Sequence, residues 1–167
     1  MEFKKPERFE YKQIVELVNN AAEIYKSIHS KYLFTEIGYG NETEESLIKG
    51  EKNREYLCAY KDKEVIGYAS FYLKNNQTVW INMFYINSNN QKQGFGSLFI
   101  SEIEKIAKKY KASVLTLESD KKAIWAINFY KKNDFQILSD EDLTKFPFDK
   151  VLSKPQVKMR YIFGKKV

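Results

Sequence analysis

The sequence contains few of the residues that build disulfide frameworks, metal sites or irregular turns. It has one cysteine, one histidine and three prolines among 167 residues, and only seven glycines. A single cysteine cannot form an internal disulfide, and Cys58, in the strand-like segment EYLCAY, is interpreted as a buried and unreactive thiol. One histidine and one cysteine cannot build a zinc site, so no metal is expected.

Long hydrophobic runs are also absent. No apolar run reaches about 20 residues, the length that spans a bilayer, and the first segment, MEFKKPERFEYKQ, is too charged for a secretory signal. We therefore expect a cytoplasmic protein. With 43% hydrophobic residues and 30% charged residues, the composition is that of an ordinary globular protein, and the length favours a single domain over residues 1–167.

The net charge of the chain is positive, but the basic residues are not concentrated in one segment. The net charge is +6, and the lysines are scattered through segments such as KKYK, DKK and YKKND. A nucleic-acid-binding protein is one reading of this charge, and it predicts salt-sensitive binding to DNA or RNA. A solvated surface with a mild attraction for small anions is favoured, because no long basic block occurs.

The first half of the chain predicts helices followed by three antiparallel strands. Apolar residues recur at helical spacing from about Glu7 to Tyr32, and a short helix capped by Thr43 or Asn41 follows. REYLCAY and VIGYASFYL, joined by the turn KDKE, predict a hairpin. After the turn signal NNQ, the segment TVWINMFYI predicts a third strand that is buried on both faces.

The second half alternates helices and strands. One helix is predicted to bury an apolar face comprising Phe95, Leu98, Phe99, Ile103, Ile106, Ala107 and Tyr110. SVLTLES is a short strand between two helices and should lie parallel to the strand before it. AIWAINFYKK predicts a helix, and DFQIL and QVKMRYIF predict strands that close the sheet. The fold class is therefore α/β, with a mixed sheet and a parallel pair near its middle.

Two glycines one residue apart, Gly94 and Gly96, stand between a predicted strand and a predicted helix. Unpaired amides and the dipole at a helix N-terminus attract anions, and glycine lets the backbone approach a phosphate closely. A tight turn with nothing bound explains the same spacing equally well. The dinucleotide fingerprint fails because Phe99 stands where its third glycine belongs, and GFGSLF also fails the phosphate-loop pattern.

The segment Gln91-Lys92-Gln93-Gly94-Phe95-Gly96 resembles the acetyl-CoA signature Gln/Arg-x-x-Gly-x-Gly/Ala of the GNAT superfamily of N-acetyltransferases. About thirty residues later, AIWAINFYKKNDF resembles the family's second landmark, a helix carrying Ala-x-x-Phe-Tyr before a short strand. The resemblance implies a mostly antiparallel mixed sheet of about six to seven strands, flanked by helices, with a splayed parallel pair that binds acyl-CoA. It covers residues 55–138 most fully.

Three positions depart from the family pattern. Ser88 replaces a common proline, and Asp134 replaces a common glycine before the last motif strand. Both positions reflect backbone preferences. Ala123 replaces an asparagine before the second landmark, and this change removes a side chain that could contact the cofactor.

The resemblance implies a site for acetyl-CoA as the cosubstrate. Backbone groups of one strand would pair with the pantetheine arm and polarise the thioester carbonyl, and the amides of the following turn would hold the pyrophosphate. Plain core packing is the alternative for the strand residues. The residues so assigned are Phe84, Tyr85, Ile86, Gln91, Lys92, Gln93, Gly94, Phe95, Gly96 and Ser97.

The resemblance also implies an acid, and the chemistry requires a base. Tyr130 matches the family tyrosine that protonates the departing thiolate, with packing on the sheet as its alternative role. A base must deprotonate the acceptor amine; Glu118 is the main candidate, and Tyr85 and Asp120 are others. Asp120 or Ser119 could instead cap the next helix. His29 is interpreted as a surface or packing residue on a helix.

The acceptor is expected to be a primary amine of a small molecule or a protein, attacked directly by its nitrogen. Residues 35–51 hold five glutamates and one lysine, a net charge of −4, which would suit a cationic acceptor such as a polyamine. Glutamates also favour the first turn of a helix, and this second explanation is preferred. A non-catalytic acyl-CoA-binding regulatory module is the alternative function, and a monomer or a homodimer is expected.

Overall fold

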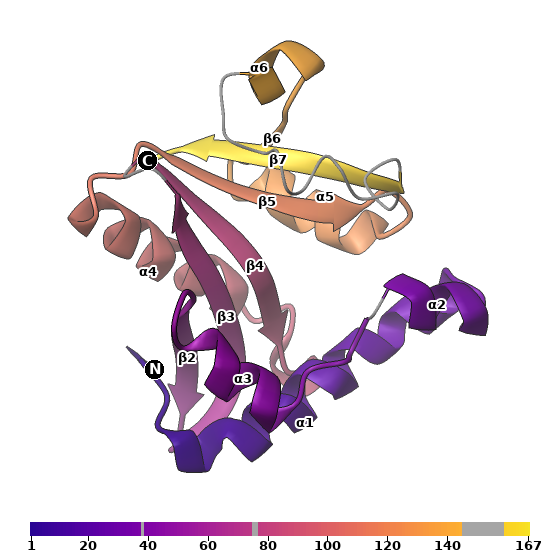
Figure 1. Cartoon of the computed structure of the whole chain (residues 1–167), viewed down its shortest axis with the longest axis vertical. Coiled ribbons are helices and arrows are strands. Elements are labelled where there is room, and N and C mark those ends of the chain that lie inside the picture. The colour runs from indigo at the N-terminus through magenta and orange to yellow at the C-terminus, as the bar shows by residue number, and fades with distance from the viewer. Residues whose placement is uncertain (38, 75–76, 145–158) are drawn as a thin grey trace. The chain divides into compact units, whose positions relative to one another are not determined.

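A computed structural model describes residues 1–37, 39–74, 77–144 and 159–167 of the chain. The chain divides into two compact units, one comprising Met1–Tyr72 and Asn82–Glu102 and the other comprising Leu73–Ile81 and Ile103–Val167. Strands β3 (Glu64–Lys74) and β4 (Thr78–Ile86) each contribute residues to both units. Figure 1 labels both strands. The expectation of one domain over residues 1–167 stays a prediction.

Seven strands form a mixed sheet in the described part of the chain, in the order β1-β2-β3-β4-β5-β7-β6. Besides β3 and β4, they are β1 (Glu2–Lys4), β2 (Glu55–Lys61), β5 (Val114–Asp120), β6 (Gln136–Ile137) and β7 (Arg160–Lys166). The pair β4–β5 is parallel, whereas β1–β2, β2–β3, β5–β7 and β6–β7 are antiparallel. The predicted α/β fold with one central parallel pair is confirmed. Strand β1 was not predicted.

The hairpin between β2 and β3 turns at the predicted KDKE segment. Asp62 and Lys63 have positive φ values of 51° and 71°, as the two central residues of a type I′ turn do. The ladder closes with Lys61 opposite Glu64. The predicted turn is therefore confirmed.

The first helical region is shorter and more broken than the sequence predicts. The first unit begins with η1 (Arg8–Glu10) and α1 (Tyr11–Ala22), but the chain then tightens into the 3₁₀ helix η2 (Glu23–Ser27) and resumes as α2 (Lys31–Ile37). The helical stretch predicted from about Glu7 to Tyr32 is therefore confirmed over most of its length, but it is interrupted between Ser27 and Lys31. At the break, Tyr25 stacks on Tyr39 with ring centroids 4.0 Å apart, so aromatic packing takes precedence over helical spacing.

The helix α3 (Glu44–Gly50) begins as predicted. The Thr43 side chain accepts a hydrogen bond from the Ser46 amide, and the Ser46 hydroxyl accepts one from the Thr43 amide. This capping box identifies Thr43, rather than Asn41, as the cap. Apolar and aromatic side chains from α1, α3, β2 and β3 form the core of this unit: Tyr11, Ile14, Leu17, Val18, Leu47, Tyr56, Cys58, Tyr60, Val65 and Tyr68.

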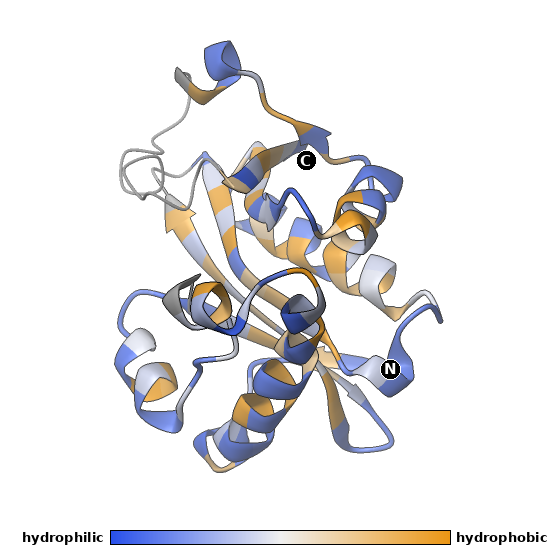
Figure 2. Ribbon diagram, turned by 90° about the vertical axis from the view of Figure 1, so that its right-hand side faces the viewer, coloured by the Kyte–Doolittle hydropathy of each residue, from blue (hydrophilic) through white to orange (hydrophobic). Residues whose placement is uncertain are grey.

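Helix α4 (Phe95–Lys109) follows the two glycines, as predicted. Phe99, Ile100, Ile103 and Ala107 are its buried residues, so the buried face is narrower than predicted. Leu98 is 53% exposed and Tyr110 lies beyond the helix end at 45%. Figure 2 shows hydrophobic and hydrophilic residues sharing the turns of the helices, as expected for amphipathic helices.

The second unit pairs β5 with β7 along seven positions, from Val114↔Lys166 to Asp120↔Arg160. Helix α5 (Ile124–Lys132) follows β5, as predicted. The predicted strand DFQIL shortens to the two residues of β6, and helix α6 (Asp140–Thr144), which was not predicted, follows. The predicted strand QVKMRYIF forms β7 from Arg160 on, while residues 156–158 lie outside the described residues, as do residues 75–76 of the predicted NNQ turn.

Asp134, which replaces the usual glycine of the family pattern, adopts a backbone conformation that favours glycine. Its φ is +64°, in the left-handed region that glycine adopts without strain. The side chain is 87% exposed, and its carboxylate lies 3.8 Å from Lys165 Nζ. The turn therefore keeps the conformation that glycine would favour, but an aspartate occupies it.

Candidate functional site

The turn between β4 and α4 is held by its own side chains. The 3₁₀ helix η3 (Ser88–Asn90) opens it, and Asn87 Oδ1 accepts a hydrogen bond from the Asn89 amide at 3.2 Å. Gln91 Nε2 donates to the Ile86 carbonyl at 3.0 Å, and Gln93 Nε2 donates to the Asn89 carbonyl at 2.9 Å. Both glutamines of the predicted signature therefore fix the shape of the turn.

A glycine is favoured at position 94 by the backbone conformation and not by close packing of neighbouring atoms. Its φ is +85°, and a Cβ placed on it would meet no atom of the described chain within 4 Å. Lys92 also has a positive φ of 60°. A glycine that needs the left-handed conformation and faces open space leaves room for a ligand close to the backbone.

Five consecutive amides of this turn make no hydrogen bond with any described residue; they are the N–H groups of Lys92, Gln93, Gly94, Phe95 and Gly96. The Ser97 amide differs, because it donates to the Gly94 carbonyl at 3.1 Å. The last two unbonded amides lie in the first turn of the fifteen-residue helix α4, where the helix dipole adds positive potential. We call residues 92–96 the amide cradle. It can hold an anion such as a phosphate.

The last part of β4, before this turn, extends beyond its described pairing with β5. The parallel ladder with β5 runs from Thr78↔Val114 to Ile81↔Leu117 and has no further pair in the described chain, although β4 continues to Ile86. The side chains there pack inside the first unit. The Phe84 ring lies 5.3 Å from the Phe99 ring, and Tyr85 packs against the core. The core packing that was the alternative role of Phe84 and Tyr85 is therefore present.

Tyr130 packs within the second unit. It is 9% exposed, and its ring centroid lies 5.3 Å from Phe129, 5.7 Å from Phe135 and 5.6 Å from Phe163. The packing role expected as an alternative is therefore present. The catalytic role stays a prediction.

The base candidates of the second unit are engaged in other interactions. Glu118 forms a hydrogen-bonded ion pair with Arg160 across the β5–β7 pair. Asp120 Oδ1 accepts a hydrogen bond from the Lys122 amide at 2.8 Å. The cap of α5 is Ala123, without a side-chain bond, so the expectation that Asp120 or Ser119 caps this helix is wrong: β5 continues through Asp120 and the helix starts later.

The acidic segment of residues 35–51 has mostly structural roles where it is described. Glu44 and Glu45 lie in the first turn of α3, as the preferred explanation predicts. Glu51 forms a bidentate pair with Arg8, at 2.6 and 2.9 Å, and accepts a hydrogen bond from Tyr11 Oη at 2.8 Å. Arg8 and Tyr11 lower the pKa of Glu51. Gly38, within the same segment, lies outside the described residues.

Glu42 is the member of this segment that sequence patterns did not single out. It is 4% exposed, and burial raises the pKa of its carboxyl although Arg54 opposes the rise. A single glutamate outside any helical or strand pattern gives no signal of burial. The nearby Arg54 is the one hint, because a buried carboxylate needs a cationic or hydrogen-bonding partner.

Cys58 and His29 both lie in packed surroundings. Cys58 is fully buried, and burial raises the pKa of its thiol, as expected for an unreactive cysteine. His29 lies between η2 and α2 rather than on a helix, and its ring stacks on that of Tyr39, with the ring centroids 5.9 Å apart.

The described residues contain no cluster of His, Cys, Asp or Glu that could hold a metal. None of the described helices combines the length and apolar character needed to cross a membrane.

A family model connects these features with known proteins. The model of the acetyltransferase (GNAT) family matches residues 15–135. This range contains β4, the amide cradle and α5 with Tyr130. A search of curated proteins gives no significant match.

Solved structures resemble the chain over much of its length. The PaiA N-acetyltransferase of Thermoplasma acidophilum, in complex with coenzyme A, has 18% identity and a TM-score of 0.79 over 99% of this chain and 98% of that chain. The ribosomal-protein-S18-alanine N-acetyltransferase of Escherichia coli has 11% identity and a TM-score of 0.70 over 99% and 93%. A GNAT acetyltransferase of Elizabethkingia anophelis with acetyl-CoA bound has 16% identity and a TM-score of 0.58 over 75% and 84%. At these identities, the likeness concerns the fold.

Proposed function

Because the chain belongs to the acetyltransferase (GNAT) family, we propose that it transfers an acetyl group from acetyl-CoA to a primary amine by direct nucleophilic attack. The amide cradle carries this proposal. Five unbonded amides at the start of α4, with open space at Gly94, match the needs of a pyrophosphate. The family membership identifies which pyrophosphate compound to expect.

Acetyl-CoA would be held by backbone groups. The cradle binds the pyrophosphate, and the part of β4 beyond its described pairing with β5, at Phe84, Tyr85 and Ile86, aligns with the amide groups of the pantetheine arm. An N–H of this part of β4 donates to the thioester carbonyl and stabilises the negative charge that develops on its oxygen. Gln91 and Gln93 contribute by fixing the turn.

The chemistry requires one proton to leave the amine and another to reach the thiolate. The neutral amine attacks the acetyl carbon, the C–S bond breaks, and the Tyr130 hydroxyl donates a proton to the sulfur. The nitrogen, now bonded to the acetyl carbon, gives up one N–H proton, and this proton returns to the Tyr130 oxygen through water, so that the products are the neutral amide and the CoA thiol. A phenol with a pKa near 10 can protonate a thiolate as it forms. Glu118, the predicted base, would first have to release Arg160.

The acceptor is proposed as a primary amine of a small molecule or a protein. A polyamine remains the more specific proposal, but its support is narrower than the sequence indicated. Glu51 is neutralised by Arg8, and Glu42 is buried beside Arg54. Among the described side chains of the segment, the exposed Glu44 and Glu45 are left to attract a cation.

The test measures CoA release by thiol titration with acetyl-CoA and each of three amines: spermidine, L-lysine amide and an alanine-ended peptide. Release above the amine-free rate with at least one amine supports the proposal. Binding of acetyl-CoA without release would instead support the regulatory acyl-CoA module. Indifference to acetyl-CoA together with salt-sensitive binding of DNA or RNA would support the nucleic-acid alternative.

A further inference from the structure

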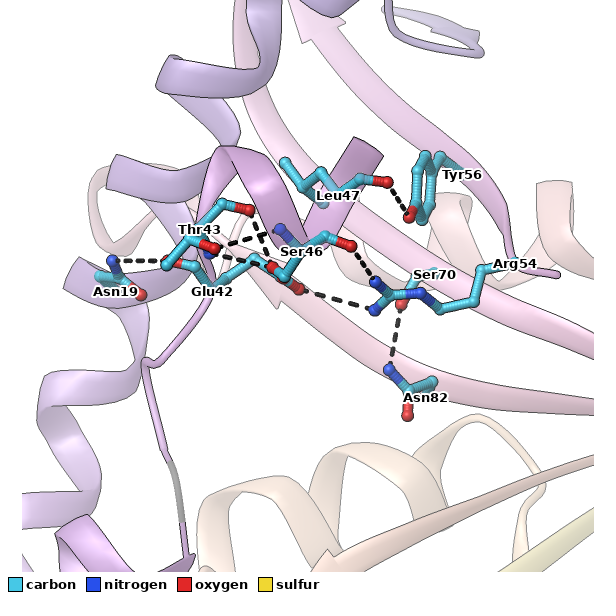
Figure 3. A network of polar contacts seen from close by, with 9 residues as sticks. All are labelled: Asn19, Glu42, Thr43, Ser46, Leu47, Arg54, Tyr56, Ser70 and Asn82. Carbon is cyan, nitrogen blue, oxygen red and sulfur yellow. Dashed lines mark hydrogen bonds and ion pairs between the residues drawn. The ribbon is translucent and has the colours of Figure 1, made fainter. Parts of the chain in front are cut away.

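A cluster of polar side chains lies inside the first unit, where α3 meets β3 and the start of β2. Figure 3 shows its members other than Tyr68, with Glu42 beside Arg54 and Asn82 bonded to Ser70. We call this group the Glu42 cluster. Its members are Asn19, Glu42, Arg54, Tyr68, Ser70 and Asn82.

Buried polar atoms of this cluster are left without hydrogen-bond partners among the described residues. They are Glu42 Oε2, Tyr68 Oη and Asn19 Oδ1. The other carboxylate oxygen of Glu42 accepts a hydrogen bond from the Ser46 hydroxyl, whereas Oε2 lies 3.8 Å from Arg54 Nη1, beyond hydrogen-bond distance. Leaving one buried polar group unbonded costs about 1–3 kcal/mol. Buried water commonly bonds such groups in folded proteins.

The cluster reaches the surface at Asn82. Asn82 Nδ2 donates to Ser70 Oγ at 3.3 Å, and Ser70 is fully buried whereas Asn82 is exposed. Asn82 is the first β4 residue beyond the last pair with β5. It precedes Phe84 by two residues, about 6–7 Å along a strand. The surface end of the cluster is therefore close to the part of β4 proposed to hold the thioester.

The proposed reaction needs a proton acceptor that can work near neutral pH. A primary amine with a pKa near 10.4 is neutral in only about one molecule per thousand at physiological pH. The base candidates of the second unit, Glu118 and Asp120, already hold Arg160 and the Lys122 amide. Glu42 Oε2, in contrast, has lone pairs that no described group uses.

We propose that Glu42 receives the proton that the acceptor amine loses, and that water bound between Glu42, Tyr68, Ser70 and Asn82 carries it there. The inference rests on the proposed acetyl transfer. An N–H bond of the ammonium breaks and its proton passes to a water molecule. That water passes one of its own protons onward, and an O–H bond forms at Glu42 Oε2. The electron pair left on the nitrogen then attacks the acetyl carbon.

The charged and titratable groups facing Glu42 suit this role. Arg54, from the start of the β2 region, favours the ionised carboxylate, while burial outweighs it and raises the pKa of Glu42, which makes the carboxylate a stronger base. Tyr68, from β3, has a pKa raised by burial and by the charge of Glu42, so its hydroxyl stays neutral. Burial raises the pKa of Tyr56 to about 12, and its hydroxyl donates to the Leu47 carbonyl.

The test is the pH dependence of kcat/KM for CoA release, with the three amines named above, for the wild type, Glu42→Gln and Glu51→Gln. The wild type should level off once Glu42 is ionised. Glu42→Gln should lose about 100-fold near neutral pH and then gain about tenfold per pH unit up to the pKa of the amine. Glu51→Gln is the matched control, because Glu51 belongs to the same acidic segment and also holds an arginine. Its profile should keep the shape of the wild-type profile.

A Glu42→Gln profile that is lowered equally at every pH would overturn the inference and leave Glu42 with a structural role. If Glu42→Gln does not fold, Tyr68→Phe decides, because it removes one hydroxyl of the water-binding group and no charge. It should steepen the profile in the same direction, and an unchanged shape overturns the inference. A wild type that binds acetyl-CoA but releases no CoA with any of these amines would refute the acetyl transfer itself, and with it the reaction that Glu42 is proposed to serve.

Discussion

The two parts of strand β4 both contain aromatic and aliphatic residues, but their side chains have different environments. Thr78, Val79, Trp80 and Ile81 are all buried and pair with β5 along the whole of that stretch. From Asn82 to Tyr85 the side chains are exposed or half-buried, and no described residue of β5 pairs with them. The first part of the strand thus pairs with β5, whereas the second part extends beyond the described pairing with β5. The predicted burial on both faces is right for the first part and wrong for the second.

The comparison predicts unequal costs of truncation in the two parts. Ile81→Ala removes a buried side chain that is 3% exposed, and it should lower the free energy of unfolding by about 2–5 kcal/mol. Met83→Ala, in the half-buried part, should cost less than about 2 kcal/mol, because less apolar area is lost. Urea denaturation of both variants measures the difference. Equal costs would mean that the second part is packed as tightly as the first.

The proposed catalytic role of Tyr130 can be tested without disturbing the packing of its ring. Tyr130→Phe keeps the ring among Phe129, Phe135 and Phe163 and removes the hydroxyl, so kcat should fall about 100-fold with nearly unchanged acetyl-CoA affinity. Tyr161→Phe, in β7 of the same unit, is the control and should leave kcat unchanged. An unaffected kcat in Tyr130→Phe would leave this tyrosine with packing alone.

The amide cradle follows β4 and η3 along the chain, and the next variant tests whether the cradle binds a ligand. Gly94→Ala adds a methyl group that meets no described protein atom, at a φ of +85°. We expect a loss of stability of about 1–2 kcal/mol from the left-handed backbone and a loss of acetyl-CoA affinity of at least about tenfold, or about 1.4 kcal/mol.

Gly40→Ala provides the control, because Gly40 also has a positive φ, of 68°, but lies outside the cradle. It should lose stability without losing acetyl-CoA affinity in calorimetric titration. A Gly94→Ala protein that binds acetyl-CoA as tightly as the wild type would mean that the glycine serves the turn alone.

The smallest predicted effect is a gain in stability. Asp134→Gly places the residue without a Cβ at a φ of +64°, and should raise the free energy of unfolding by about 0.5–1 kcal/mol. The lost pair with Lys165 is exposed and contributes little. Thermal unfolding should show a rise in Tm. A lower Tm would mean that the aspartate stabilises the turn in a way that φ does not reveal.

Most of the fold could be predicted because local patterns and tertiary packing agree. Alternation and turn residues located β2, β3 and their turn, and helical periodicity located α4 and α5. Failures occurred where packing overrides the pattern. The N-terminal helical stretch is interrupted near Tyr25, whose ring stacks on Tyr39, and three-residue β1 is too short to show a period.

The site was predictable where function depends on the backbone. Glycine spacing indicated the amide cradle, because a positive φ and the close approach of a ligand to the backbone both favour glycine, which can be recognised in the sequence. Side-chain partners were not predictable in the same way. Glu118 pairs with Arg160 and Glu42 lies beside Arg54, and in both cases the partners come from separate elements that only the fold brings together.

The most direct test of the central claim is calorimetric titration of the protein with acetyl-CoA, with ATP as the control anion. The unbonded amides and the open space at Gly94 predict one selective site per chain for acetyl-CoA and much weaker binding of ATP. Equal binding of the two compounds, or no binding of acetyl-CoA, would contradict the account, because the cradle would then be a turn or a general anion site on a GNAT fold.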